Sequence, residues 1–433
     1  MLIKSIFTNS SGILFSRVLG FIRDLLTASI LGANIYSDIF FVAFKVPNLF
    51  RRIFAEGAFT QAFIPAYAKS KHKIQFSSAI FLSFFAFIML LSLLVTLFSK
   101  FVTSFIAIGF DDKTIELTAP LLAINFYYLP MIFIVTFMAA LLQYKNHFAT
   151  TAFSTALLNL SLIAALLISK DLDKYDITFY LSYGVLIGGM LQILVHIIAL
   201  KNKNLLKVLS FNKIKFAQRK FYNSFAAATL GSSTAHLSAF IDTWLASFLI
   251  SGSISYLYYA NRIFQLPLAL FAIATSVALF PMIAKAIKNK NENKALSLMK
   301  KASMILSVLL LISSFIGIFF NEFIVELLFQ RGEFTQVDTM NTALILLMYL
   351  IGLLPYGISK IFSLWLYAQE KQFIAAKISM KALTFNIVFS LILFKPYGAT
   401  GLAFASTIGG FVLFYYTIKE FGFKKFYNLF KNS

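Results

Sequence analysis

Charged side chains interrupt two long apolar stretches near the start of the chain. The first stretch carries Arg17, Arg23 and Asp24, and the second carries five further charges: Asp38, Lys45, Arg51, Arg52 and Glu56. An ionised side chain at the centre of a bilayer costs roughly 2.5–3.5 kcal/mol on insertion scales, so such residues are expected to face a water-filled cavity and to bind something there. Cations outnumber acids in both stretches. The sequence therefore predicts a cavity that accepts an anionic ligand.

Nearby acids offset part of the charge in the first stretch. Arg17 and Asp24 are seven residues apart, which places them on nearly one face of a helix. Arg23 adjoins Asp24 and can share its carboxylate. One acid is too few to neutralise both arginines.

In the second stretch, most charges have an acid at helical spacing. Asp38 and Lys45 can partly neutralise each other, and Arg52 and Glu56 are one helical turn apart, which suits an ion pair. We interpret Lys45 and Arg52 as paired or interfacial side chains. Arg51 remains an unmatched cation.

Arg262 is the corresponding cation in the second half of the chain. It lies within SISYLYYANRIFQLP, beside Tyr258 and Tyr259, and no carboxylate lies within two helical turns of it. A planar guanidinium with five N–H donors suits phosphate oxygens better than an ammonium group does. We predict that four arginines bind a diphosphate or a similar head group: Arg17, Arg23, Arg51 and Arg262. The supporting charges are predicted to be Asp24, Asp38, Arg52 and Glu56.

Asp242 is a lone acid in the apolar segment AHLSAFIDTWLASFL. It can pair with Arg262, coordinate a cation such as sodium, or titrate, and the sequence leaves these alternatives open. Asn386 and Ser406, on later apolar runs, can supply further oxygen ligands. We therefore name Asp242 and Asn386 as a candidate cation site. Four other polar residues of apolar runs are predicted to have packing or interface roles: Asn159, Lys360, Lys377 and Lys381.

The composition is that of a polytopic membrane protein. Of 433 residues, 59% are hydrophobic and 13% are charged, and the mean hydropathy is +0.82. The net charge of +21 lies mainly in loops on one side of the predicted topology, so the positive-inside rule explains it better than nucleic-acid binding does. The chain has no cysteine and four histidines without ligand spacing. It therefore predicts no disulfide, no metal site and no catalytic group.

Twelve apolar runs are each long enough to span a bilayer, because about 20 helical residues suffice. They fall at 5–31, 37–67, 75–99, 117–142, 150–169, 177–200, 221–250, 254–284, 299–320, 339–368, 374–394 and 399–418. Several are longer than needed and require tilt or a break. We expect a break in the second run at Pro47, in the eighth at Pro267 and Pro281, and in the tenth at Pro355 and Gly357.

Loop charge sets the predicted orientation. Connections after odd-numbered runs mix acids with a few cations, whereas those after even-numbered runs, and the tail, are overwhelmingly basic. Both termini should therefore lie in the cytoplasm. The longest basic connection, 201–220, includes an amphipathic patch and is expected to lie along the inner surface, attracted to anionic lipids.

The two halves of the chain repeat. Ala28-Ser29 followed by Gly32 recurs as Ala246-Ser247 followed by Gly252, and Pro47 and Pro65 correspond to Pro267 and Pro281. We predict an all-α polytopic fold of about 12 transmembrane helices, in two six-helix lobes related by a parallel repeat around a central cavity. The predicted parts are a lobe at 1–200, the linker 201–220, a lobe at 221–420 and a basic cytoplasmic tail at 421–433.

Four segments carry a family resemblance: FSRVLGFIRD, SDIFFVAFKVPNLFRRIFAEGAFTQAFIPAYAK, ASFLISGSISYLYYANRIFQLP and LFQRGEFT. Together they resemble the MurJ (MviN) lipid II flippase family of the multidrug/oligosaccharidyl-lipid/polysaccharide exporter superfamily. The resemblance runs from the first residues to about residue 420. It implies a flippase that moves the undecaprenyl-diphosphate-linked peptidoglycan precursor from the inner to the outer leaflet of the bacterial cytoplasmic membrane by alternating access.

The resemblance also implies roles for individual residues. The essential arginines of the family fall on Arg17, Arg23, Arg51 and Arg262, and its conserved acids fall on Asp24 and Asp38. Its cation site falls on Asp242 and, less closely, on Asn386. The family pattern has fourteen helices, of which the last two shape a groove for the lipid tail. The twelve runs of this chain include no counterpart of them.

The implied ligand is lipid II, and the other expected partners are anionic membrane lipids and the cell-wall synthesis machinery. No cofactor is expected. The resetting step can use the membrane potential, Na⁺ or H⁺, and the sequence does not distinguish them. Three alternatives remain: a flippase for another polyprenyl-diphosphate saccharide, a cation-coupled drug exporter, and a membrane enzyme. A drug exporter would need an acidic or apolar cavity, and an enzyme would need paired carboxylates or a histidine near a membrane face.

Overall fold

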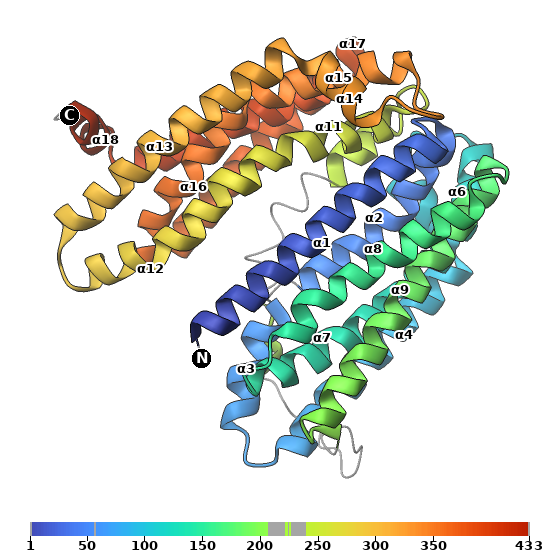
Figure 1. Ribbon diagram of the computed structural model, residues 1–433, viewed down its shortest axis with the longest axis horizontal. Helices are drawn as coiled ribbons and strands as arrows, with labels where there is room; N and C mark the ends of the chain where they lie inside the picture. Colours follow the sequence, from blue (N-terminus) through green and yellow to red (C-terminus); the bar gives the residue numbers. More distant parts are fainter. Residues whose placement is uncertain (1, 56–57, 207–220, 224, 227–239, 432–433) are drawn as a thin grey trace. The chain divides into compact units, whose positions relative to one another are not determined.

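The computed structural model describes residues 2–55, 58–206, 221–223, 225–226 and 240–431, with the side chains of 2–10 and 51–58 left out. These residues contain helices and no strand. They divide into two compact units, Met1–His236 with Arg331–Phe334, and Leu237–Gln330 with Thr335–Ser433. Figure 1 labels the helices of both units.

Nine helices make up most of the described part of the first unit. They are α1 (Leu2–Leu31), α2 (Ile35–Ala55), α3 (Ala58–Lys69), α4 (Lys73–Leu97), α5 (Ser99–Ile106), α6 (Asp112–Phe126), α7 (Tyr128–Tyr144), α8 (Ala149–Ser169) and α9 (Lys174–Asn202). Helix α1 packs against α8, and α8 packs against α9, along most of their lengths (Figure 1). The position of α1 is therefore fixed by a helix that is more than a hundred residues away in sequence.

The described part of the second unit begins with a helical segment at residues 240–246, and nine further helical elements follow it. These are α11 (Ser253–Pro267), the π-helical turn η2 (Leu268–Ile273), α12 (Ala274–Lys288), α13 (Glu292–Phe319), α14 (Asn321–Phe329), α15 (Gln336–Ile351), α16 (Leu353–Ala368), α17 (Gln372–Phe421) and α18 (Phe423–Lys431). Helix α17 joins the last two predicted runs, and Gly398, with φ +56° and ψ −139°, interrupts it at the predicted connection. The predicted fold class, an all-α polytopic membrane protein, is confirmed.

Eight described stretches are long and apolar enough to cross a membrane. They are Lys73–Leu97, Asp112–Tyr144, Ala149–Ser169, Lys174–Asn202, Ser253–Lys288, Glu292–Phe319, Gln336–Ala368 and Gln372–Phe421. Helices α1 and α2 are absent from this set and carry the charges discussed above. The linker 201–220 lies largely outside the described residues, as does the middle of the seventh predicted run, 221–250.

Three predicted helix breaks are wrong in position. Helix α12 continues through Pro281 to Lys288. Helix α2 continues through Pro47 to Ala55. The tenth run breaks at Gly352, between α15 and α16, and not at Pro355 or Gly357. The break predicted at Pro267 is confirmed, because α11 ends there and the π-helical turn follows.

The repeat has a structural counterpart. Gly32 and Gly252 are the glycines that correspond between the two halves, and they adopt left-handed backbone conformations with φ +76° and +91°. Each lies just before the helix that carries the second landmark, α2 or α11. A left-handed turn at this point favours glycine, because a Cβ would clash with the carbonyl that follows.

Candidate functional site

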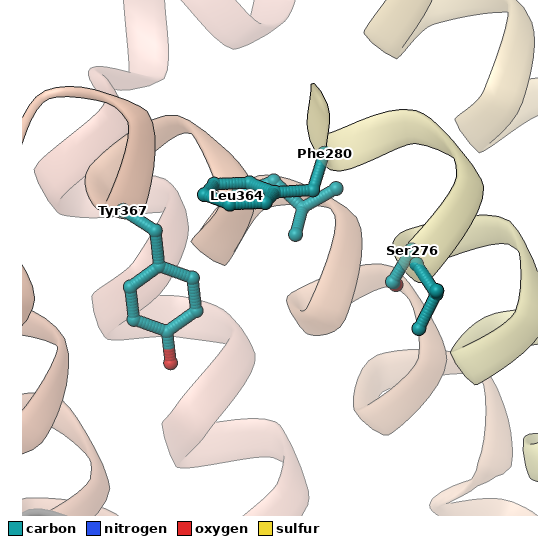
Figure 2. Close-up of a pocket in the computed structure, with 5 residues that line it drawn as sticks. Ser276, Phe280, Leu364 and Tyr367 are labelled. Carbon is teal, nitrogen blue, oxygen red and sulfur yellow. The ribbon is translucent and has the colours of Figure 1, made fainter. Parts of the chain in front are cut away.

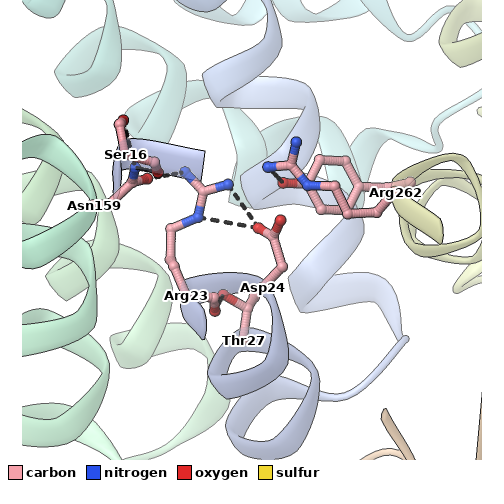
Figure 3. A network of polar contacts seen from close by, with 7 residues as sticks. Ser16, Arg23, Asp24, Thr27, Asn159 and Arg262 are labelled. Atoms are coloured by element: carbon pink, nitrogen blue, oxygen red, sulfur yellow. Dashed lines mark hydrogen bonds and ion pairs between the residues drawn. The ribbon is translucent and has the colours of Figure 1, made fainter. Parts of the chain in front are cut away.

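The predicted charge cluster of α1 is a defined network of contacts in the first unit. The Arg23 guanidinium donates from Nη2 to Asp24 Oδ1 at 2.6 Å, and from Nε to the same oxygen at 3.1 Å. Its Nη1 donates to Asn159 Oδ1 at 3.0 Å (Figure 3). The side chains of Arg23 and Asp24 are 13% and 1% exposed. The predicted sharing of Asp24 by Arg23 is therefore observed.

Asn159 of α8 holds this arginine from the other side. Its Nδ2 donates to the backbone carbonyl of Ser16 at 2.9 Å, while its Oδ1 accepts from Arg23. The amide thus ties α8 to α1 at two points two helical turns apart. The sequence predicts a packing or interface role for Asn159 and does not identify Arg23 as its partner. The one available signal was an amide within an otherwise apolar run, which does not identify a partner so distant in sequence.

Arg17 differs from Arg23 in its surroundings. It lies on α1, two turns before Asp24, and its side chain is exposed. Among the described residues it has no hydrogen bond and no ion pair. Its guanidinium donors are therefore available to a ligand, as far as the described part of the chain shows.

The charges of α2 are only partly described. Asp38 is 2% exposed and lies in the first turn of α2. Its negative charge there interacts favourably with the positive end of the helix dipole. This turn is fixed by Asn34, whose Oδ1 accepts from the backbone N–H of Tyr36 at 2.9 Å. Lys45 is half-buried further along the helix. The predicted contributions of Arg51, Arg52 and Glu56 concern side chains outside the described residues.

Arg262 is a half-buried residue of α11 in the second unit. Its guanidinium lies over the ring of Tyr258, 5.7 Å from the centroid, and its Nη2 is 3.5 Å from the Tyr258 hydroxyl. A cation over an aromatic face is attracted by the ring quadrupole, so Tyr258 orients this arginine. Figure 3 shows the contact.

The candidate cation residues of the second unit meet at Ser406. The Ser406 hydroxyl donates to Asp242 Oδ2 at 3.4 Å and accepts from Asn386 Nδ2 at 3.1 Å. The Tyr356 hydroxyl donates to the Ser406 carbonyl at 2.9 Å. The carboxylate of Asp242, the hydroxyl of Ser406 and the side-chain amide of Asn386 include the types of oxygen ligand that hard cations prefer. The described residues contain no group of three or more His, Cys, Asp or Glu side chains that could hold a metal ion.

A pocket of the second unit does not coincide with any predicted site. It has a volume of about 320 Å³ and is lined by Ser276, Val277, Phe280, Leu364 and Tyr367, from α12 and α16 (Figure 2). The lining has two hydroxyl groups and no charged side chain. It therefore lacks the donors that a diphosphate needs.

Comparison with known proteins gives one consistent result. Residues 27–431 match the model of the family described as Lipid II flippase MurJ. The chain is 49% identical over 422 residues to a "Probable lipid II flippase MurJ" of Helicobacter pylori (strain ATCC 700392 / 26695), covering 94% of this chain and 92% of that protein. It is 33% identical to the protein of the same name from Aquifex aeolicus (strain VF5), covering 95% of this chain and 82% of that protein.

Solved structures agree with this similarity. A structure described as lipid II flippase MurJ in an inward closed conformation matches with a TM-score of 0.83 and 27% identity, covering 97% of this chain and 89% of that chain. An inward-facing multidrug resistance MATE family transporter matches with a TM-score of 0.71 at 13% identity, covering 99% of each chain. The second likeness shows a shared fold alone.

Proposed function

The chain belongs to the lipid II flippase MurJ family, and we propose that the arginine-bearing face of its first helix binds the diphosphate of the transported lipid. The protein is a lipid II flippase, which moves the undecaprenyl-diphosphate-linked peptidoglycan precursor from the inner to the outer leaflet by alternating access. The observation that supports the proposed binding is the contrast on α1 between a fixed, paired Arg23 and an exposed Arg17.

The two arginines have different parts in this proposal. The Arg23–Asp24 pair is neutral overall, so it contributes little long-range attraction for an anion. Its guanidinium is nevertheless held in one orientation by Asp24 and Asn159, and a preorganised donor loses less conformational freedom when a phosphate binds. Arg17 supplies the uncompensated positive charge. We propose the same ligand for Arg51 and for Arg262, whose guanidinium is oriented by Tyr258.

A lipid II accessibility assay in cells tests the proposal. We expect Arg17→Ala, Arg23→Ala and Arg262→Ala to accumulate lipid II in the inner leaflet. The matched control is Lys170→Ala, which removes an exposed cation of the first unit far along the chain from the cluster. Normal flipping by all three arginine variants would overturn the cationic binding site.

We propose that the membrane potential contributes to transport. An interior-negative potential favours outward movement of an anion by about 2.3 kcal/mol per charge per 100 mV. The cluster of Asp242, Ser406 and Asn386 is proposed to bind the coupling cation, with Na⁺ and H⁺ as the two candidates. Replacing Na⁺ in a proteoliposome flipping assay separates them: Na⁺ dependence that Asp242→Asn abolishes supports a sodium site, and flipping that neither change affects argues against any site there.

The family is one of transporters, and we propose that this protein transports lipid II without changing it chemically. We further propose that it resides in the bacterial cytoplasmic membrane with both termini in the cytoplasm. Its proposed partners there are anionic lipids and the enzymes of cell-wall synthesis that consume lipid II.

A further inference from the structure

The predicted basic segment 421–433 contains a helix, α18 (Phe423–Lys431). After α17, Gly422 adopts φ +104° and the chain turns into a separate short helix, α18 (Figure 1). The segment from Lys419 to Lys431 contains four lysines and one acid, Glu420. The basic helix α18 therefore directly follows α17, a helix long and apolar enough to span a membrane.

One face of α18 is fixed to the second unit. The ring of Phe426 lies 5.2 Å from that of Phe362. Lys425 lies over the ring of Trp365, 3.8 Å from the centroid, and forms an ion pair with Glu292 of α13. These contacts set the rotation of α18 about its own axis.

The opposite face is exposed and combines two kinds of side chain. Phe423 and Tyr427 are 49% and 62% exposed, and Lys424, Asn428 and Lys431 are exposed beside them. The spacing of 423, 427 and 431, with 424 and 428 adjoining, is that of one helical face. A face with aromatic rings and lysines is typical of a helix that lies in the membrane interface, where rings enter the boundary of the acyl region and ammonium groups meet phosphates.

We propose that this exposed face of α18 binds anionic phospholipid head groups on the cytoplasmic side of the membrane. Lys425 is engaged by Glu292, so the charge available to lipid comes chiefly from Lys424 and Lys431. Each lysine near an anionic surface strengthens binding roughly fivefold. The mixture of aromatic and basic side chains next to the last long apolar helix favours a lipid surface over a soluble protein partner. The proposal is independent of lipid II transport.

The absence of cysteine allows a direct test on the full chain. An environment-sensitive fluorophore on Asn428→Cys reports whether this face enters the interface when the protein is placed in nanodiscs of phosphatidylglycerol or of phosphatidylcholine. We expect a blue-shifted emission in phosphatidylglycerol that high salt weakens, since surface charge is screened. The double variant Lys424→Glu/Lys431→Glu should lose it.

The control carries the same change in charge elsewhere, as Lys113→Glu/Lys170→Glu, and should keep the shift. Native mass spectrometry gives a second readout: the charge-reversed helix should bind added phosphatidylglycerol at least roughly 25-fold more weakly, from two lysines at about fivefold each. Equal emission in the two lipids, or an unchanged shift in the double variant, overturns the proposal. A shift that appears only on adding a cell extract identifies a protein partner and also overturns it.

Discussion

At the residue scale, the sequence identified the charged members of the α1 cluster but not the neutral one. Arg23 and Asp24 are adjacent, so their pairing followed from the chain itself. Asn159 contacts Arg23 across 136 residues of sequence, and no pattern in either segment encodes that contact. Charges inside apolar runs therefore predicted the charged members of this contact network, whereas the partner that holds the arginine depended on how α1 packs on α8.

Substitution of Asn159 tests its part in holding Arg23. Asn159→Asp adds a second carboxylate beside the guanidinium and should reduce flipping strongly, because the cluster becomes net negative. Asn159→Ala removes one hydrogen bond to a charged group and should lower the free energy of unfolding by about 1.5–3 kcal/mol. The lipid accessibility assay and thermal melts check the two expectations. Full flipping by Asn159→Asp would show that the charge of this cluster is irrelevant to transport.

His147 provides a test of pH dependence outside the membrane-spanning segments. It lies between α7 and α8, and its Nε2 is 2.8 Å from the Thr150 hydroxyl. Burial, with a smaller contribution from the charge of Lys203, lowers the pKa of His147 below its ordinary value of 6.5. The neutral form is therefore favoured in the folded protein, so the associated stability is present above pH 6.5 and is lost as the pH falls from there through the folded pKa.

The measurement is a histidine NMR titration, with His147→Asn used to assign the resonance among the four histidines. We expect a midpoint below that of a histidine in an unfolded peptide. A midpoint at or above the unfolded value would show that the site is better hydrated than its contacts indicate.

At the element scale, the apolar runs of the sequence predicted the helices, whereas its prolines predicted several helix breaks at the wrong positions. Pro355 is the third residue of α16 and Pro130 is the third residue of α7. The first turn of a helix has N–H groups without intrahelical partners, so a proline there loses no hydrogen bond. Each proline therefore marks a helix that has begun two residues earlier, which places the breaks at Gly352 and Tyr127.

The loop between α14 and α15 is the second element whose position the sequence did not reveal. Residues 331–334 come from the second half of the chain but belong to the first unit. The backbone N–H of Glu333 donates to the Ser29 carbonyl at 2.8 Å, and its carboxylate pairs with Lys174 Nζ at 2.6 Å. The motif LFQRGEFT was part of the family resemblance, and these contacts are a physical reason for its glycine and its acid.

Gly332→Ala should detach this loop. Gly332 has φ +58°, and a Cβ there would lie 2.2 Å from the Ser29 carbonyl oxygen. Gly398→Ala is the matched control, since Gly398 also has a positive φ, +56°, but no atom lies within 4 Å of its Cβ position. Hydrogen–deuterium exchange of the peptide that spans 330–335 should accelerate in the first variant only. Unchanged protection of Glu333 in Gly332→Ala would contradict the close approach.

At the scale of the whole molecule, composition and apolar runs were enough to predict an all-helical polytopic membrane fold. In each of three ion pairs, both residues lie on the same predicted side of the membrane. Lys100 with Glu116 and Lys174 with Glu333 are on the predicted outer side, and Lys425 with Glu292 is on the predicted cytoplasmic side. What the sequence could not supply was the partner of each helix, because apolar surfaces of spanning helices resemble one another and do not specify their neighbours.

Sidedness can be measured in the cysteine-free chain with single cysteines at exposed lysines. We expect Lys113→Cys and Lys170→Cys to react with an impermeant thiol reagent in intact cells stripped of their outer membrane. Lys294→Cys and Lys371→Cys should react only after the membrane is opened. The reverse pattern would place the termini outside, and labelling of all four positions in intact cells would refute the predicted spans between them.

The most direct measurement is an equilibrium titration of the purified protein with lipid II in nanodiscs, comparing the wild type with Arg17→Ala and with the control Lys170→Ala. Hydrogen bonds between charged groups are worth about 1.5–3 kcal/mol, so we predict at least tenfold weaker binding for Arg17→Ala, with an unchanged melting temperature. The control should bind as the wild type does. If folded Arg17→Ala binds lipid II with wild-type affinity, the exposed guanidinium of α1 is not a ligand of the diphosphate.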